Sequence, residues 1–73
     1  MQGFVKWFKN DKGFGFIAGD DGVEYFLHRT NVDANLIEHR TRFVLLNQTD
    51  RVEFEVEETK KGLAAIRVRK ANG

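Results

Sequence analysis

Apolar and polar positions alternate along most of the chain, and this period of two predicts β-strands rather than helices. Clusters of Asn, Asp, Gly and Lys separate the alternating segments, whose own residues are mainly β-branched or aromatic. The pattern predicts five strands, at residues 3–9, 14–18, 23–28, 51–58 and 63–70. The first three would form a meander and the last two a hairpin.

The segment between the third and fourth predicted strands, residues 29–50, has no clear period. TNVD at 30–33 is compatible with one helical turn. Residues 36–46 are too apolar for a free loop, so we expect part of them to pack against the strands. A helix and an additional short strand are both compatible with this stretch.

Closure of the strands into a small barrel is favoured, because an open sheet of this size would leave adhesive edges and a poor core. The predicted fold is therefore all-β, a five-stranded antiparallel Greek-key barrel of the OB type. The side chains expected to fill its core are Val5, Ile17, Tyr25, Leu27, Val52, Phe54, Val56, Ile66 and Val68.

A second set of rings falls on the opposite, outer face of the predicted strands. Phe14 and Phe16 share one face of the second strand, and Phe26 and His28 share one face of the third. Leaving large apolar side chains outside the core of a small domain forgoes about 1.5 to 3 kcal/mol each. A ligand would account for this exposure, and adjacent flat rings suit stacking with the unpaired bases of a single strand.

The charge balance limits the function classes further. Twelve Lys and Arg against eleven Asp and Glu give a formal net charge of +1, too little to hold duplex DNA by charge alone. Lys6, Lys9 and Lys12 lie at the ends and edge of the ring face, where they could neutralise phosphates. The glutamates of residues 51–58 face the arginines of 63–70, which predicts cross-strand ion pairs.

Catalytic and metal-binding patterns are weak. The chain has two His and no Cys, and it contains neither a nucleophile elbow nor an evident acid pair. We therefore expect no enzymatic activity, no cofactor, no metal site and no small-molecule substrate. With no charged leader and no long apolar run, we also expect neither a signal peptide nor a membrane segment, and a cytoplasmic location.

Three motifs resemble those of the cold-shock domain: VKWF at 5–8, KGFGFI at 12–17 and YFLH at 25–28. The similarity is close over residues 3–28 and holds in pattern over residues 51–70. It implies a single domain at 1–73, with an extended loop at about 30–50, that binds single-stranded DNA and RNA with low sequence specificity. It further implies an RNA chaperone or a regulator of transcription or translation.

The resemblance also assigns residue roles. It implies that Phe8 lies at the edge of the stacking surface and that Lys6 and Lys12 contact the nucleic-acid backbone. Strict alternation would place Trp7 on the core side with Val5, so its use in stacking requires a bulge or strong coiling of the first strand. The stacking residues implied are Trp7, Phe14, Phe16, Phe26 and His28.

Three departures from the usual pattern of the family change the expected site. Arg29 stands where an aromatic residue is usual, and a guanidinium plane can still stack on a base while adding a charge. The connection at 30–50 is longer and lacks a Gly-rich stretch with a phenylalanine, which leaves Phe43 as the only aromatic candidate there. Lys60 and Lys61 replace a common Gly-Pro turn and are candidates for further phosphate contacts.

Other protein classes fit the sequence less well. An RNA-recognition motif shares the KGFGF signature but needs two helices in a longer chain. GFGFIAG has the wrong glycine spacing for a dinucleotide-binding fingerprint, and no helix follows it. The remaining alternative to a monomeric nucleic-acid-binding protein is a protein-interaction module, or a dimer formed by strand exchange, that uses the aromatic patch and the apolar residues 36–46.

Overall fold

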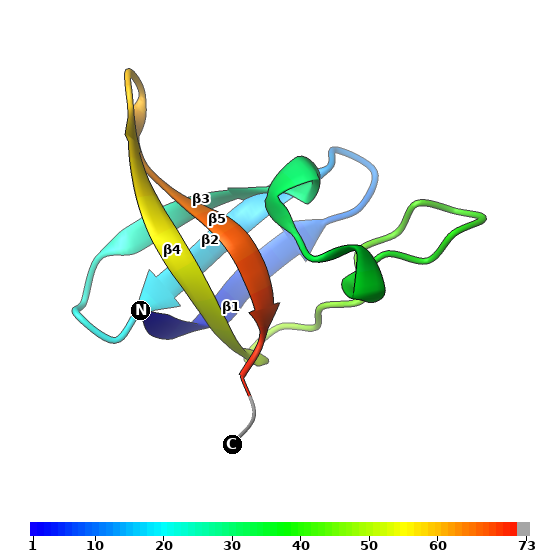
Figure 1. Ribbon diagram of the computed structural model, residues 1–73, viewed down its shortest axis with the longest axis horizontal. Coiled ribbons are helices and arrows are strands. Elements are labelled where there is room, and N and C mark those ends of the chain that lie inside the picture. Colours follow the sequence, from blue (N-terminus) through cyan, green and yellow to red (C-terminus); the bar gives the residue numbers. More distant parts are fainter. Residues whose placement is uncertain (72–73) are drawn as a thin grey trace.

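Five strands close into one barrel in the order β1-β2-β3-β5-β4, with β4 returning to β1 (Figure 1). The computed structural model describes residues 1–71. Every strand boundary lies within one residue of its predicted position, so the all-β barrel is confirmed. The strands are β1 (Gln2–Lys9), β2 (Phe14–Gly19), β3 (Glu24–His28), β4 (Arg51–Thr59) and β5 (Gly62–Lys70).

One strand pair departs from the predicted antiparallel arrangement. β3 and β5 run parallel and meet at the single pair Phe26–Ala64, whereas the other four neighbouring pairs are antiparallel. The meander β1–β2–β3 and the hairpin β4–β5 are each antiparallel internally. Joining them at both edges leaves one junction at which the two strands point the same way.

A bulge in β1 sets the orientation of its aromatic residues. Val5 pairs with Ile17 and Trp7 pairs with Phe16, so Lys6 is an extra residue without a partner of its own on β2. The extra residue reverses the alternation, which lets Val5 be fully buried while Trp7 contacts the outward ring of Phe16. The irregularity expected in the first strand is confirmed.

The core contains seven of the nine residues expected there and gains four others. The residues that the prediction placed correctly are Val5, Ile17, Tyr25, Leu27, Val52, Phe54 and Val68. Those that it missed are Val32, Val44, Leu46 and Ala65. Three of these four lie in residues 29–50, whose apolar side chains therefore pack into the core cluster.

Val56 and Ile66 were wrongly predicted to lie in the core. Val56 is 41% exposed, and Ile66 is only partly buried. The pairing of β4 with β5 shifts register between Glu53 and Glu55, opposite Arg67, which has a φ of 53°. Beyond this shift the β4–β5 hairpin projects past the barrel (Figure 1). Strict alternation therefore no longer indicates which side chains are buried there.

Residues 29–50 form neither a regular helix nor a strand. They contain two short 3-10 helices, η1 (Arg29–Asn31) and η2 (Ala34–Leu36), and η1 overlaps the helical turn predicted at 30–33. An isolated antiparallel bridge joins Ile37 to Val44 and closes an irregular hairpin, here called the insert hairpin (residues 37–44). The expected packing of the apolar stretch is confirmed, because Val44 is buried and Ile37 packs against the core.

Side-chain hydrogen bonds fix the insert hairpin at both ends. At its tip, Glu38 Oε2 accepts from the backbone N–H groups of Arg40 and Thr41 and from the Thr41 hydroxyl, and these bonds lower the pKa of Glu38. At its base, Val44 N donates to Asn10 Oδ1 at 2.6 Å, and Asn10 Nδ2 donates to Val44 O at 3.3 Å. Asn10 thereby ties the hairpin to the β1–β2 turn.

Removing the Asp21 carboxylate is expected to make stability less sensitive to acid. The Tyr25 hydroxyl and then Val23 N donate to Asp21, and these bonds hold the pKa of that carboxyl below its usual value. A carboxyl with a depressed folded-state pKa contributes stability that is complete above its unfolded pKa and is lost as the pH falls through the folded value. Below about pH 4, D21N should therefore lose less of its free energy of unfolding than the wild type.

Urea unfolding at a series of pH values measures this difference. The matched control is D11N, because Asp11 makes no side-chain hydrogen bond or ion pair within residues 1–71. D11N should follow the wild-type acid profile. If D21N also follows it, ionisation of the hydrogen-bonded Asp21 carboxyl does not contribute to stability in solution.

Candidate nucleic-acid interface

Five rings from three neighbouring strands form one continuous cluster on the outside of the barrel. Phe14 pairs with His28 and Phe16 with Phe26 across β2 and β3, and Trp7 joins them from β1. Successive ring centroids lie 5.4 to 6.4 Å apart. We call this cluster, made of Trp7, Phe14, Phe16, Phe26 and His28, the ring platform.

The ring platform lies outside the core, as the alternation predicted for its four rings on β2 and β3 and as the β1 bulge allows for Trp7. Phe26 is 37% exposed, and the other four rings are partly buried by one another and by the sheet. Most neighbouring rings are tilted or edge-on, with interplanar angles from 30° to 76°. The arrangement presents several ring faces and edges to solvent, which suits stacking with flat ligands.

Gly15, between Phe14 and Phe16, permits the close approach of β1 and β2 under the platform. A Cβ at this position would lie 2.1 Å from Trp7 O and 2.7 Å from Phe8 Cα. No side chain fits there without moving the backbone of β1. The glycine therefore allows Trp7 to reach both phenylalanine rings of β2.

The imidazole of His28 is held in place by the segment that follows it. Thr30 N donates to His28 Nδ1 at 3.3 Å, and Thr30 Oγ1 lies 2.9 Å from the same nitrogen. His28 is thus the N-cap of η1 as well as the last ring of the platform. Because its ring is used as a cap, its orientation is set before any ligand arrives.

The lysines expected near the rings have different surroundings. Lys9 Nζ lies 5.7 Å from the centroid of the Trp7 ring, close enough for a cation–π contact. Lys6 Nζ lies 2.7 Å from Glu24 Oε1 in an exposed pair, and Lys12 is exposed in the β1–β2 turn. Exposed pairs are worth about 0 to 1 kcal/mol, so a phosphate could replace Glu24 as the partner of Lys6 at little cost.

Phe8 and Phe43 lie outside the ring platform. Phe8 is partly buried and packs against the core, because the bulge turns it inward when it turns Trp7 outward. Phe43 is 51% exposed on the insert hairpin and makes no ring contact within the described residues. A contact between either ring and nucleic acid stays a prediction.

The β4–β5 turn adds a groove beside the platform that sequence reasoning did not predict. Its volume is about 630 Å³, and Phe16 and Phe26 border it on one side while Lys61 and Leu63 border it on the other. Lys60, the neighbour of Lys61 in the turn, is exposed. The groove arises because the hairpin projects past the barrel, which strand alternation cannot reveal.

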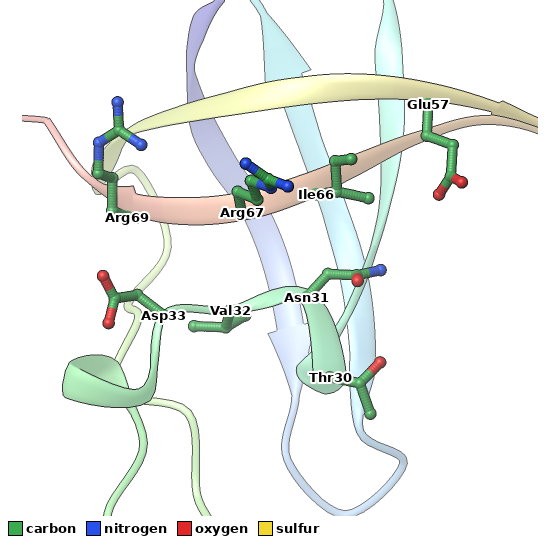
Figure 2. A pocket seen from close by; sticks show the side chains of 8 residues that line it. All are labelled: Thr30, Asn31, Val32, Asp33, Glu57, Ile66, Arg67 and Arg69. Carbon is green, nitrogen blue, oxygen red and sulfur yellow. The ribbon is translucent and has the colours of Figure 1, made fainter.

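A second groove, of about 490 Å³, lies between η1 and β5, with Thr30 and Asn31 on one side and β5 side chains on the other (Figure 2). Its two arginines face glutamates: Arg69 pairs with Glu53, and Arg67 Nη1 lies 3.5 Å from Glu55 Oε2. The predicted cross-strand ion pairs are therefore confirmed. Carboxylates also line this groove, so its positive charge is largely neutralised.

Metal ligands do not gather within residues 1–71, where no three His, Asp or Glu side chains are placed to hold an ion. The described part of the chain also contains no helix that is long and apolar enough to cross a membrane. His28, the one histidine on the platform, bonds to Thr30 rather than to a carboxylate.

Comparison with known proteins gives one consistent result. A model of the 'Cold-shock' DNA-binding domain matches residues 1–71. Cold shock-like protein CspG of Escherichia coli K12 is 48% identical over 69 residues, which are 93% of this chain and 90% of that protein. Probable cold shock protein A of Mycobacterium tuberculosis is 44% identical over 69 residues, 93% and 94% of the two chains. A cold shock-like protein of Thermotoga maritima is 39% identical, with 94% and 96% covered.

Proposed function

The chain belongs to the cold-shock DNA-binding domain family, a nucleic-acid-binding family, and from this premise we propose that it binds single-stranded DNA and RNA by stacking bases on the ring platform. The observation that carries the proposal is the continuous cluster of five rings outside a core that is complete without them. Each stacked base is worth about 1 to 3 kcal/mol.

In the proposed complex, bases face the platform and phosphates face outward. Lys6, Lys9 and Lys12 flank the rings and would neutralise phosphates, and Lys61 would do so from the β4–β5 turn. Every base has a face that can stack, so sequence preference is weak. A duplex is a poor ligand because its bases are already stacked on one another.

The cellular role that fits this mode of binding is that of an RNA chaperone or a regulator of transcription or translation. A protein that binds many sequences by stacking would keep single strands unpaired and accessible. We propose a cytoplasmic binding protein without catalytic activity, in which residues 1–73 form a single domain and residues 30–50 an extended loop. Trp7, Phe14, Phe16, Phe26 and His28 are its proposed base-stacking residues.

We propose that the protein acts as a monomer. Leu36, Ile37, Val44 and Leu46 of the apolar stretch pack within the same chain, so strand exchange is not needed to cover them. Phe43 and Leu45 remain about half exposed, at 51% and 50%. Two such side chains form a smaller apolar surface than a stable protein interface would need.

Titration of Trp7 fluorescence tests the proposed function. Trp7 is the only tryptophan and a member of the platform, so a stacked base should quench its emission. We expect a pyrimidine-rich single strand to quench it and the matching duplex not to do so. Equal binding of single strand and duplex would rule out stacking on the platform.

A salt series on the same titration measures the phosphate contacts. Each neutralised phosphate of a single strand contributes about −0.7 to the slope of log affinity against log salt. Three lysine contacts therefore give an expected slope of about −2. A slope near zero would show that the lysines around the platform do not contact the strand.

A further inference from the structure

A pocket of about 370 Å³ lies between η1 and the insert hairpin, next to the end of the ring platform. Arg29 and Thr30 line it from η1, and Ile37 and Arg42 line it from the insert hairpin. We call it the arginine pocket. Two arginines that are thirteen positions apart in the sequence line it, together with the apolar side chain of Ile37.

The positive charge of the arginine pocket is not neutralised by neighbours. No carboxylate lines the pocket, and neither Arg29 nor Arg42 forms an ion pair with any other residue in the range 1–71. The groove between η1 and β5 is the contrasting case, because its Arg67 and Arg69 pair with Glu55 and Glu53. Of these two hollows, each lined by two arginines, the arginine pocket is the one suited to an anion.

Arg29 is held against the β1–β2 turn. Its backbone N–H donates to Gly13 O at 3.0 Å, and its Cδ lies 3.4 Å from the position that a Cβ on Gly13 would take. Gly13 has a φ of 76°, a conformation in which glycine is favoured. The aliphatic part of Arg29 therefore packs over a turn that leaves room for it.

Arg42 is held by the tip of the insert hairpin. It has a left-handed φ of 63°, and its N–H donates to Glu38 O at 2.9 Å. The nearby Glu38 carboxylate is already bonded to the backbone of the tip through Arg40 and Thr41, and it does not line the pocket. The tip that fixes the Arg42 backbone thus keeps the neighbouring Glu38 carboxylate bonded elsewhere.

The pocket continues the path of the ring platform. Arg29 directly follows His28, the last ring, and Thr30 both holds that ring and lines the pocket. A base stacked on His28 would leave the next part of its backbone at the mouth of the pocket. Guanidinium groups bind phosphate through two parallel hydrogen bonds, which a lysine cannot do.

We propose that the arginine pocket binds a phosphate of the single strand, at the nucleotide beyond the base stacked on His28. This inference rests on the proposed function. It assigns to Arg29 and Arg42 the role of phosphate ligands. The site next to the His28 end of the ring platform is then a charged site and not another stacking position. Ile37 supplies an apolar surface for the adjoining sugar.

The first test compares affinities for a thymidine hexamer, measured by Trp7 quenching. R42N removes the guanidinium, and asparagine tolerates the left-handed backbone at this position, so the fold is expected to persist. We expect R42N and the second variant, R29Q, to bind about three- to tenfold more weakly and to have a salt slope less negative by about 0.7. The matched control is R67Q, which removes an exposed arginine from the other groove and should bind as the wild type does.

A second test locates the phosphate. Hexamers with one neutral methylphosphonate linkage at each position in turn are compared with hexamers that carry a 5′- or a 3′-phosphate. If one internal linkage weakens binding to the wild type but not to R42N, the pocket holds a phosphodiester. If a terminal phosphate strengthens binding to the wild type but not to R42N, it holds a terminal monoester.

The results separate the inference from its premise. If the wild type binds the hexamer and both R42N and R29Q bind it with unchanged affinity and salt slope, the pocket does not hold a phosphate, although the proposed function stands. The inference also fails, and the proposed function also stands, if R42N responds to every modified hexamer as the wild type does. If the wild type binds no single strand, the proposed function fails and the inference fails with it.

Discussion

Replacing Phe16 by alanine is expected to weaken binding of a single-stranded pyrimidine oligonucleotide about fivefold to 150-fold, the equivalent of about 1 to 3 kcal/mol per stacked base. Phe16 contacts Trp7 and Phe26 within the platform, at centroid distances of 5.4 and 5.7 Å. The substitution therefore removes a central ring. Binding can be followed by fluorescence anisotropy of a labelled oligonucleotide, which does not depend on Trp7.

The F16A barrel should stay folded, because Phe16 is not part of the core cluster. The loss of ring contacts is expected to cost about 1 kcal/mol of stability. F4A is the matched control, since Phe4 is 40% exposed on β1 and contacts none of the platform rings within the described chain. Unfolding of F16A would identify Phe16 as a core residue, and wild-type affinity would show that stacking on it does not contribute to binding.

Replacing Phe54 by alanine, in contrast to F16A, should strongly reduce stability and leave most of the protein unfolded. Phe54 is 1% exposed, is the largest fully buried side chain, and packs against Tyr25 at a centroid distance of 5.2 Å. Truncating a buried phenylalanine costs about 3 to 5 kcal/mol, through lost burial and the cavity left behind. A domain of this size rarely has more than about 3 to 5 kcal/mol of stability, so the loss approaches the whole.

Circular dichroism during thermal and urea unfolding measures this effect. The companion variant F54L keeps an apolar side chain and should remain folded with a lowered midpoint. Val56, two residues further along β4, gives the positional control: V56A should cost much less than F54A because Val56 is 41% exposed. Similar losses for V56A and F54A would contradict the register shift between β4 and β5.

The strands and the outward rings could be predicted because both depend on local alternation. In β2 and β3, every second residue faces the core, so Phe14, Phe16 and Phe26 follow directly once Ile17 and Leu27 are placed inside. Turn residues such as those of GDDG fix the boundaries with little help from distant contacts. Local information is sufficient for this half of the barrel.

Alternation fails where a strand gains a residue or leaves the barrel. The bulge at Lys6 could be inferred only from the roles of its neighbours, and the shift at Arg67 left no trace in the pattern of β5, which made Val56 and Ile66 look buried. Local alternation also does not predict ion pairs between residues that are far apart in the sequence. Glu24 was not expected as the partner of Lys6, although β1 and β3 flank β2 and bring the two side chains together across it.

The insert hairpin was the least predictable segment, because its conformation depends on side-chain hydrogen bonds and not on a periodic pattern of apolar residues. Glu38 closes its tip, and the bonds between Asn10 and Val44 span 34 positions of the sequence. Neither residue type marks such a role in advance. The arginine pocket depends on these contacts, which is why Arg42 did not stand out in the sequence.

The link between Asn10 and Val44 has a consequence for the energetics of recognition. A long loop that becomes ordered only on binding loses conformational entropy at that moment, which weakens affinity and slows association. Here the insert hairpin is ordered during folding, by two hydrogen bonds to the turn that joins β1 and β2. The insert hairpin is thus preorganised, and an incoming strand would meet a hairpin whose backbone at Arg42 is already held in place.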